Sequence, residues 1–139
     1  MIECSITVPG AAAPQGSKRV VRLRNGRIAL LESSAKVKPY RAVVSLAARA
    51  AWIGPPADGP VEVSLAFTFA RPKSHFTGKG ALRAGAPVTP GKPDIDKLCR
   101  AVLDALTGVV YADDAQVVGL KATKRYGPIP GTDIHIWPI

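Results

Sequence analysis

The sequence predicts a single domain of the α+β class, in which a mixed β-sheet packs against two main helices. The chain has 139 residues, of which 47% are hydrophobic, and this suits one compact domain with its own core. Several segments alternate apolar and polar residues as strands do, while two others have the spacing of helices. No internal repeat or composition boundary divides the chain, so residues 1–139 are expected to form one domain.

Alternating segments mark the strands. Residues 2–8 and 61–69 alternate most clearly, and the second is expected to be a central strand with one well-packed face. Further strands are predicted at residues 116–124 and 133–137. Between residues 20 and 31, Asn25-Gly26 tolerates the positive φ angles of a tight turn and predicts a hairpin.

Two helices are expected. Pro39 suits the first turn of a helix that runs to about Ile53. Its inward residues are expected to be Val43, Ala47 and Ala50 or Ala51, with Leu46 beside them. In the second helix, Asp94 or Asp96 caps the start and Gly108 lies just beyond the end. Its inward stripe is predicted to be Leu98, Val102, Ala105 and Leu106, flanked by Leu103.

The charge of the chain indicates its class of partner. Nineteen Lys and Arg against 10 Asp and Glu give a net charge of +9. Such an excess favours a polyanion, through phosphate contacts and counterion release. A basic surface that serves solubility, or an RNA binder of the ribosomal type, remains an alternative. Charge alone therefore does not separate an enzyme from a binding protein.

Two segments concentrate the positive charge. The predicted hairpin is either a DNA-binding ribbon or a solvated edge hairpin, and it carries Lys18, Arg19, Arg22, Arg24 and Arg27. Residues 71–91 are rich in Gly, Pro and basic residues and contain no acid, so a long, exposed and flexible loop is expected. This loop is either a DNA contact or a solvated insertion. The side chains suited to a phosphate backbone are Arg71, Lys73, Lys79, Arg83 and Lys92.

The chain is expected to be cytoplasmic. No apolar run approaches the length of a membrane-spanning helix, and the first residues lack the pattern of a signal peptide. Cys4 and Cys99 have neither metal-ligand spacing nor the density of a secreted scaffold, so free thiols are expected.

The acidic residues are unevenly distributed. Five of the 10 lie between positions 94 and 114, namely Asp94, Asp96, Asp104, Asp113 and Asp114. Only two basic residues, Lys97 and Arg100, share that window. Carboxylates repel a phosphate ligand, so a protein built only to hold nucleic acid has no reason to gather them. A protein that brings a divalent cation to a phosphate has such a reason.

Geometry allows these acids to meet. Asp94-Ile95-Asp96 aims two carboxylates from the start of a helix of about 12 residues, which spans roughly 18 Å. Residues 108–112, extended at about 3.3 Å each, reach about as far. Asp113-Asp114 can therefore return to the same end if the next strand runs antiparallel to the helix. Clustered carboxylates would raise one another's pKa, and a divalent ion would relieve this.

The predicted site is thus a magnesium site with cationic neighbours. Magnesium prefers hard oxygen ligands and keeps several waters. Arg100, one turn after Asp96, can contact the scissile phosphate or orient a carboxylate. Lys124, at the end of the next strand, is a second candidate for stabilising the transition state, whereas Asp104 suits a surface or salt-bridge role. The alternative to a metal site is that Asp94 and Asp96 are ordinary charges at a helix N-terminus and that Asp113 and Asp114 belong to a turn rich in Asp.

Linked motifs now resemble a known family. They are Lys92-Pro93-Asp94-Ile95-Asp96-x-Leu98-x-Arg100, Leu103-Asp104-Ala105-Leu106-Thr107-Gly108, and Tyr111-x-Asp113-Asp114-x-Gln116-Val117 with Lys124. They resemble the signature of the RusA family of Holliday-junction resolvases. Val8-Pro9-Gly10 and the following Gln-Gly-Ser-Lys-Arg loop are similar to phage-type members. The resemblance runs from the first strand to the last.

The resemblance implies a homodimeric α+β enzyme of a bacterial or phage-infected cell. It would bind four-way DNA junctions and nick two opposing strands symmetrically with Mg²⁺, for which Mn²⁺ is a possible substitute, and without a small-molecule cofactor. It carries catalytic or metal-binding roles onto Asp94, Asp96 and Asp114, with Asp113 adjacent. Two positions depart from the family pattern: Arg100 stands where Lys is usual, and Lys97 where Asn is common. The extra cation Lys97 also joins the predicted DNA-binding residues.

Two other functions remain open. A divergent restriction-type nuclease would use Pro93-Asp94 and Asp114-x-Gln116, but position 116 lacks the expected Lys. A non-catalytic nucleic-acid-binding protein would use the basic segments alone, with the acids merely structural.

Overall fold

The computed structural model describes residues 3–16, 18–32 and 35–139. Its strands are β1 (Cys4–Pro9), β2 (Lys18–Arg22), β3 (Ile28–Glu32), β4 (Val61–Phe69), β5 (Val117–Tyr126) and β6 (Gly131–Pro138). Its helices are α1 (Val37–Ala51) and α2 (Ile95–Leu106), with the short 3-10 turns η1 (Lys73–His75) and η2 (Asp114–Gln116). Ile2, with which the first predicted strand begins, lies outside the described residues.

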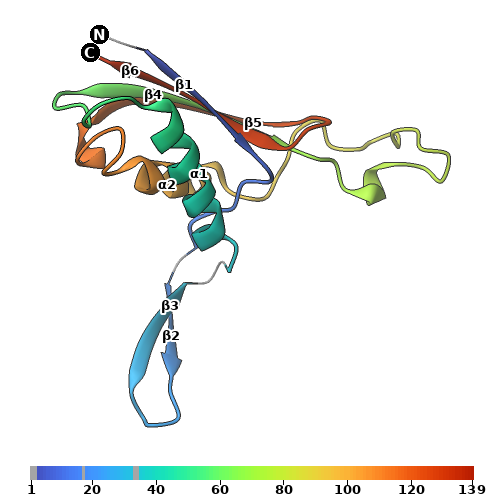
Figure 1. The fold of residues 1–139 in the computed structure, drawn as a ribbon. Coiled ribbons are helices and arrows are strands. Elements are labelled where there is room, and N and C mark those ends of the chain that lie inside the picture. Colours follow the sequence, from blue (N-terminus) through green and yellow to red (C-terminus); the bar gives the residue numbers. More distant parts are fainter. Residues whose placement is uncertain (1–2, 17, 33–34) are drawn as a thin grey trace.

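One four-stranded sheet forms the body, in the order β1-β6-β4-β5. β4 and β5 are parallel, whereas β6 is antiparallel to both β1 and β4. Parallel neighbours need a long crossover, and the segment that contains α2 supplies it. Both helices cover the same face of the sheet (Figure 1). The predicted α+β class, with a mixed sheet and two helices, is confirmed.

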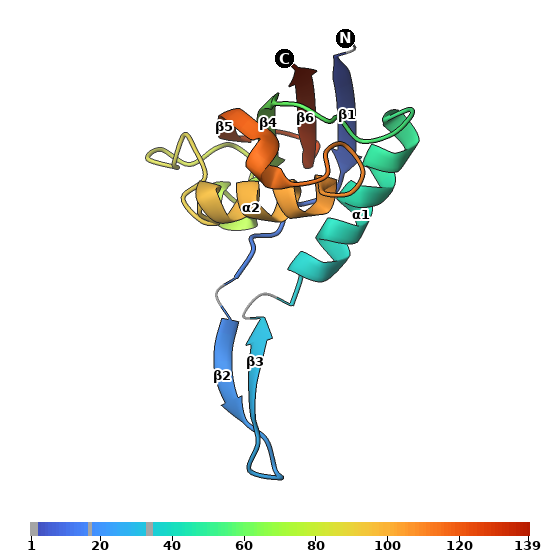
Figure 2. The ribbon, with the colours of Figure 1, turned by 90° about the vertical axis from the view of Figure 1, so that its left-hand side faces the viewer.

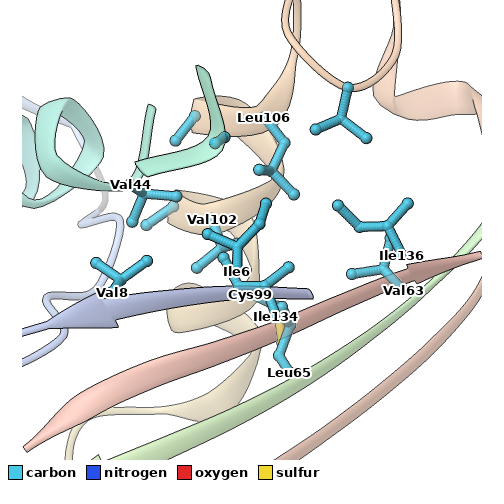
Figure 3. Close-up of a cluster of buried hydrophobic side chains, with 14 of the residues drawn as sticks. Ile6, Val8, Val44, Val63, Leu65, Cys99, Val102, Leu106, Ile134 and Ile136 are labelled. Atoms are coloured by element: carbon cyan, nitrogen blue, oxygen red, sulfur yellow. The ribbon is translucent and has the colours of Figure 1, made fainter. Parts of the chain in front are cut away.

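The core lies between that face of the sheet and the two helices. β4 lies between β6 and β5 and buries Val61, Val63, Leu65 and Phe67, as predicted for a central strand. Figure 3 shows side chains from β1, β4 and β6 meeting those of α2 and of Val44 on α1. A sheet face and a helix stripe thus exclude water together, which supplies the main favourable term in folding.

The register of α2 matches its prediction. Leu98, Val102, Ala105 and Leu106 are all buried. Asp94 is the N-cap residue, although its side chain makes no capping hydrogen bond. Gly108 follows the C-cap with φ +85°, a left-handed conformation that glycine adopts without a Cβ clash.

The predicted inward face of α1 is only partly correct: Ala47 and Ala51 are partly buried against the core, but the other predicted residues are not. Val43 and Leu46 are 41% and 71% exposed, and the buried residues are Val37, Tyr40, Val44 and Ala48. The helix begins at Val37, so Pro39 lies in its first turn as expected, and it ends at Ala51. Tyr40 turns inward, where its hydroxyl lies 2.6 Å from Thr132 Oγ1. Because small apolar residues occur all round this helix, its sequence pattern did not fix the rotation.

The basic hairpin β2–β3 extends away from the body on the helix side (Figures 1 and 2). Its turn differs from a two-residue turn with two positive φ angles, because only Gly26 has positive φ. Gly26 N–H donates to the Leu23 carbonyl, and Asn25 Oδ1 accepts from Arg27 N–H. The hairpin is therefore confirmed, with a longer loop at its tip.

The loop between β4 and α2 has internal structure. It contains η1 and an isolated bridge between Phe76 and Leu82. Arg71 lies over the ring of Tyr126, with its Cζ 4.5 Å from the ring centroid, and donates to the Pro87 carbonyl. These contacts fasten the loop to the end of β5.

Two further expectations concern compartment and thiols. No helix within the described ranges combines the length and apolarity needed to cross a membrane. Cys4 and Cys99 are both buried and free, so the expected free thiols are confirmed.

Candidate functional site

An open groove between α2 and β5 contains part of the acidic cluster. Two of the predicted aspartates, Asp96 and Asp114, line it together with Arg100. We call it the α2–β5 groove, and its lining residues are Ile95, Asp96, Cys99, Arg100, Leu103, Asp114, Leu120 and Ala122. The carboxylates of Asp96 and Asp114 and the guanidinium of Arg100 thus line one groove whose other lining residues are apolar.

The chain brings Asp114 to this groove by a different route from the one predicted. Residues 108–112 do not run extended beside the helix. Gly108 N–H donates to the Tyr111 carbonyl at 2.7 Å, which closes a turn directly after α2. Tyr111 is fully buried, and its hydroxyl donates to the Leu103 carbonyl at 2.7 Å. Asp114 therefore enters the groove from the C-terminal half of α2, whereas Asp96 lies in its first turn.

Asp113 has a structural partner. Its side chain accepts a hydrogen bond from Ala115 N–H at 2.9 Å and caps η2. The Gln116 side chain accepts in return from Asp113 N–H at 3.0 Å, which makes a capping box. Asp113 thus fixes the turn that carries Asp114.

Asp94 is held by lysines rather than directed at other carboxylates. Its Oδ1 lies 3.0 Å from Lys92 Nζ, and its Oδ2 lies 3.7 Å from Lys97 Nζ. The hydrogen bond and charge of Lys92, with further charge from Lys97 and Lys124, lower the pKa of Asp94. The cation that departs from the family pattern, Lys97, is therefore one of the partners of Asp94.

Asp114 is shifted in the opposite direction. Partial desolvation raises the pKa of its carboxyl, and the hydrogen bond and charge of Asp113 and the charge of Asp104 add to this. The mutual repulsion expected of clustered acids therefore raises the pKa of Asp114, whereas the pKa of Asp94 responds to its lysine neighbours.

These opposite shifts predict opposite changes in melting temperature without metal. The raised pKa of Asp114 means that its anion destabilises the fold, and this penalty appears as pH rises through the folded pKa. The lowered pKa of Asp94 means that its anion stabilises the fold, and this benefit disappears as pH falls through the folded pKa. At neutral pH in EDTA, Asp114→Asn should raise the melting temperature and Asp94→Asn should lower it. Thermal unfolding measures both changes. Melting temperatures that change in the same direction in the two variants would contradict the prediction.

The groove fits a magnesium ion only in part. Within residues 3–16, 18–32 and 35–139, no three His, Cys, Asp or Glu side chains lie close enough together to hold one metal ion. Magnesium, however, is often bound through one or two carboxylates while it keeps several waters and binds substrate phosphates. Asp96 and Asp114 both line this groove and carry hard oxygen donors of the kind that magnesium prefers.

The two predicted cationic partners, Arg100 and Lys124, differ in their contacts. Arg100 lines the groove and makes no hydrogen bond or ion pair with any other side chain in the described part of the chain. Lys124 Nζ instead donates to the carbonyls of Gly91 and Pro93. Lys124 therefore holds the segment that leads into α2, and Arg100 is the cation free to meet a ligand.

The predicted DNA-binding residues lie on two projections and beside α2. Arg22 and Arg24 are exposed on the hairpin, while the side chains of Lys18 and Arg19 lie outside what the structure describes. Lys73 and Lys79 are exposed on the loop, and the Lys92 side chain is 88% exposed. Arg71 and Arg83 differ, because both donate to carbonyls within the loop.

The sequence analysis placed Gln116 only in the family motif and in the restriction-type alternative, and it predicted no structural role for this side chain. Its side chain makes four hydrogen bonds: two hold the turn at Ala112 and Asp113, and two join η2 to the segment before β4. The spacing Asp113-x-x-Gln116 is the signature of a capping box, and it could have predicted the hydrogen bond from Asp113 N–H to Gln116, but not the bonds to Ala57 and Gly59.

The described residues thus combine a basic surface with two carboxylates and an arginine in one open groove. A comparison with protein families finds a match over residues 9–137 to the family described as Endodeoxyribonuclease RusA. The chain belongs to the RusA endodeoxyribonuclease family. It is also 34% identical over 138 residues to "Uncharacterized protein YqaN" of Bacillus subtilis (strain 168), a match that covers 94% of this chain and 92% of that protein.

Proposed function

We propose that the chain resolves four-way DNA junctions by magnesium-dependent hydrolysis, nicking two opposing strands symmetrically. One observation carries the proposal: Asp96, Asp114 and Arg100 line a single groove in a member of the RusA endodeoxyribonuclease family. The net charge of +9 supports a DNA partner, because phosphate contacts dominate such binding.

In this proposal Asp96 and Asp114 hold the magnesium ion, and Asp94 is the third ligand. When bound, the ion would supply an activated water for attack on phosphorus and would stabilise the charge on the leaving oxygen. Asp113 is assigned to the turn, because its carboxylate already caps η2.

Asp94 must give up its lysine partners to join this set. Both ion pairs are open to solvent, with the Asp94 side chain 40% exposed and that of Lys92 88% exposed. Exposed ion pairs of this kind contribute little to stability. DNA phosphates compete for the lysines, so substrate binding would release Asp94 toward the groove.

Arg100 is proposed to contact the scissile phosphate. Its planar guanidinium can donate two hydrogen bonds to phosphate oxygens, which an ammonium group at the same position cannot do in one plane. Lys124 acts indirectly, by holding the Gly91 and Pro93 carbonyls and with them the start of α2.

The remaining surface is proposed to bind the arms of the junction. The hairpin contributes Arg22 and Arg24, with Lys18 and Arg19 beside them, and the loop contributes Lys73 and Lys79. A homodimer would present two equivalent grooves to two opposing strands, so paired cuts would follow from symmetry. The site of action is the cytoplasm of a bacterial or phage-infected cell.

A comparison of substrates tests the proposal. With Mg²⁺, a synthetic four-way junction should be cleaved, while a linear duplex that contains the same sequences should remain intact. Equal cleavage of both would favour the restriction-type alternative. Binding without cleavage in either Mg²⁺ or Mn²⁺ would favour the binding-only alternative.

A further inference from the structure

The side-chain amide of Gln116 uses all of its hydrogen-bonding capacity. Its Oε1 accepts from Ala112 N–H at 2.9 Å and from Asp113 N–H at 3.0 Å. Its Nε2 donates to the carbonyls of Ala57 and Gly59, both at 2.8 Å. An amide has two donors and one oxygen with two lone pairs, so no capacity is left over. Gln116 is therefore fixed in one orientation.

These bonds hold the chain on both sides of Asp114, at Ala112 and Asp113 before it and at Gln116 after it. Two of them hold the residues immediately before Asp114, and the other two fasten the turn to the segment that leads into β4. A backbone bond from Ala57 N–H to the Val110 carbonyl, at 2.7 Å, fastens the same two segments a second time. The exposed turn thus has a rigid attachment even though it is only one turn long.

The turn needs such an attachment because residues 112–115 are exposed and have few packing contacts of their own to hold them. With its backbone held at 112–116, Asp114 remains on the lining of the α2–β5 groove. Groups that orient metal ligands in this way commonly affect metal affinity or activity by about 10- to 100-fold.

We propose that Gln116 is a positioning residue for Asp114: by clamping the 112–116 turn to Ala57 and Gly59, it sets the carboxylate for a divalent cation. This inference rests on the proposed function, in which Asp114 is a metal ligand. Gln116 itself touches neither the metal nor the DNA.

The test compares Gln116→Met with Tyr40→Phe. Methionine keeps the length of the side chain and removes all four hydrogen bonds. Tyr40→Phe removes one buried hydrogen bond, to Thr132, at a residue that does not line the groove, and therefore reports on general destabilisation. Gln116→Asn keeps an amide that is one methylene too short, and it replaces Gln116→Met if that variant does not fold.

Three quantities are measured: Mn²⁺ binding to the DNA-free protein by titration calorimetry, junction affinity in EDTA, and the single-turnover cleavage rate. For Gln116→Met, Mn²⁺ affinity and cleavage rate should both fall by about 10- to 100-fold, while junction affinity stays unchanged. Tyr40→Phe should match the wild type in all three. Amide exchange of Ala112 and Asp113 should accelerate only in Gln116→Met.

Wild-type Mn²⁺ affinity in folded Gln116→Met would overturn the inference, and so would an equal loss in Tyr40→Phe. Asp114→Asn, measured alongside, separates the two claims. If Asp114→Asn cleaves normally, the proposed function itself fails. If Asp114→Asn is inactive while Gln116→Met and Gln116→Asn behave as wild type, only the positioning role fails.

Discussion

Asp96→Asn and Asp114→Asn should each abolish junction cleavage while junction binding survives or tightens. Each substitution removes one carboxylate from the α2–β5 groove with almost no change of shape. The metal chemistry is worth several kcal/mol of transition-state stabilisation, which corresponds to about a 10³-fold loss of rate. Binding should not weaken, because a negative charge near DNA phosphates has been removed. Single-turnover cleavage and junction affinity in EDTA measure the two effects separately.

Asp104→Asn is the matched control for this prediction. Asp104 lies on the same helix and is exposed, but it does not line the groove. Its neutralisation removes the same charge and should leave the cleavage rate within a few-fold of wild type. Normal cleavage by either groove variant would show that the assigned site is wrong. A comparable loss in Asp104→Asn would show that the net charge of the region, and not metal ligation, controls the rate.

Replacing Arg22, Arg24 and Arg27 together by alanine should produce the largest loss of DNA affinity. These three side chains are exposed on a hairpin that extends away from the body (Figure 1). A two-stranded hairpin is marginally stable alone in water, which favours a partner that covers it. Each phosphate contact contributes about 0.9 to the slope of log affinity against log salt concentration. Loss of three contacts should therefore make that slope shallower by about three units.

The control for the hairpin removes the same charge elsewhere. Lys38, Arg49 and Lys121 are exposed on α1 and β5. Their replacement by alanine lowers the net charge equally without touching the hairpin. If both triple variants change the salt dependence alike, the hairpin acts only through overall charge and the proposed contact is wrong.

The sequence predicted the fold best for elements that have one buried face and one face exposed to solvent. The alternation of β4 and the apolar stripe of α2 each specify a buried face, and the structure has both. The rotation of α1 was missed, because alanines on several sides leave the stripe ambiguous. The observed rotation buries Val37, Val44 and Ala48 and lets Tyr40 contact Thr132, which is far away in the chain.

The site was predictable in its residue types and less so in its connections. The clustering of aspartates pointed to one place, and Asp96 and Asp114 do line one groove. The path through residues 108–112 was not predictable, since it depends on the burial of Tyr111 against α2. The lysine partners of Asp94 were missed for a similar reason, because ion pairing at a helix start depends on side-chain geometry.

The most direct test is the cleavage of a four-way junction labelled in turn on each of its four strands, across a Mg²⁺ titration. Cleavage should require the ion and should stop in EDTA. The cuts should fall at symmetrical positions in two opposing strands. A junction that is bound tightly but left uncut at every Mg²⁺ and Mn²⁺ concentration would contradict the assignment of the α2–β5 groove as a metal-dependent nuclease site.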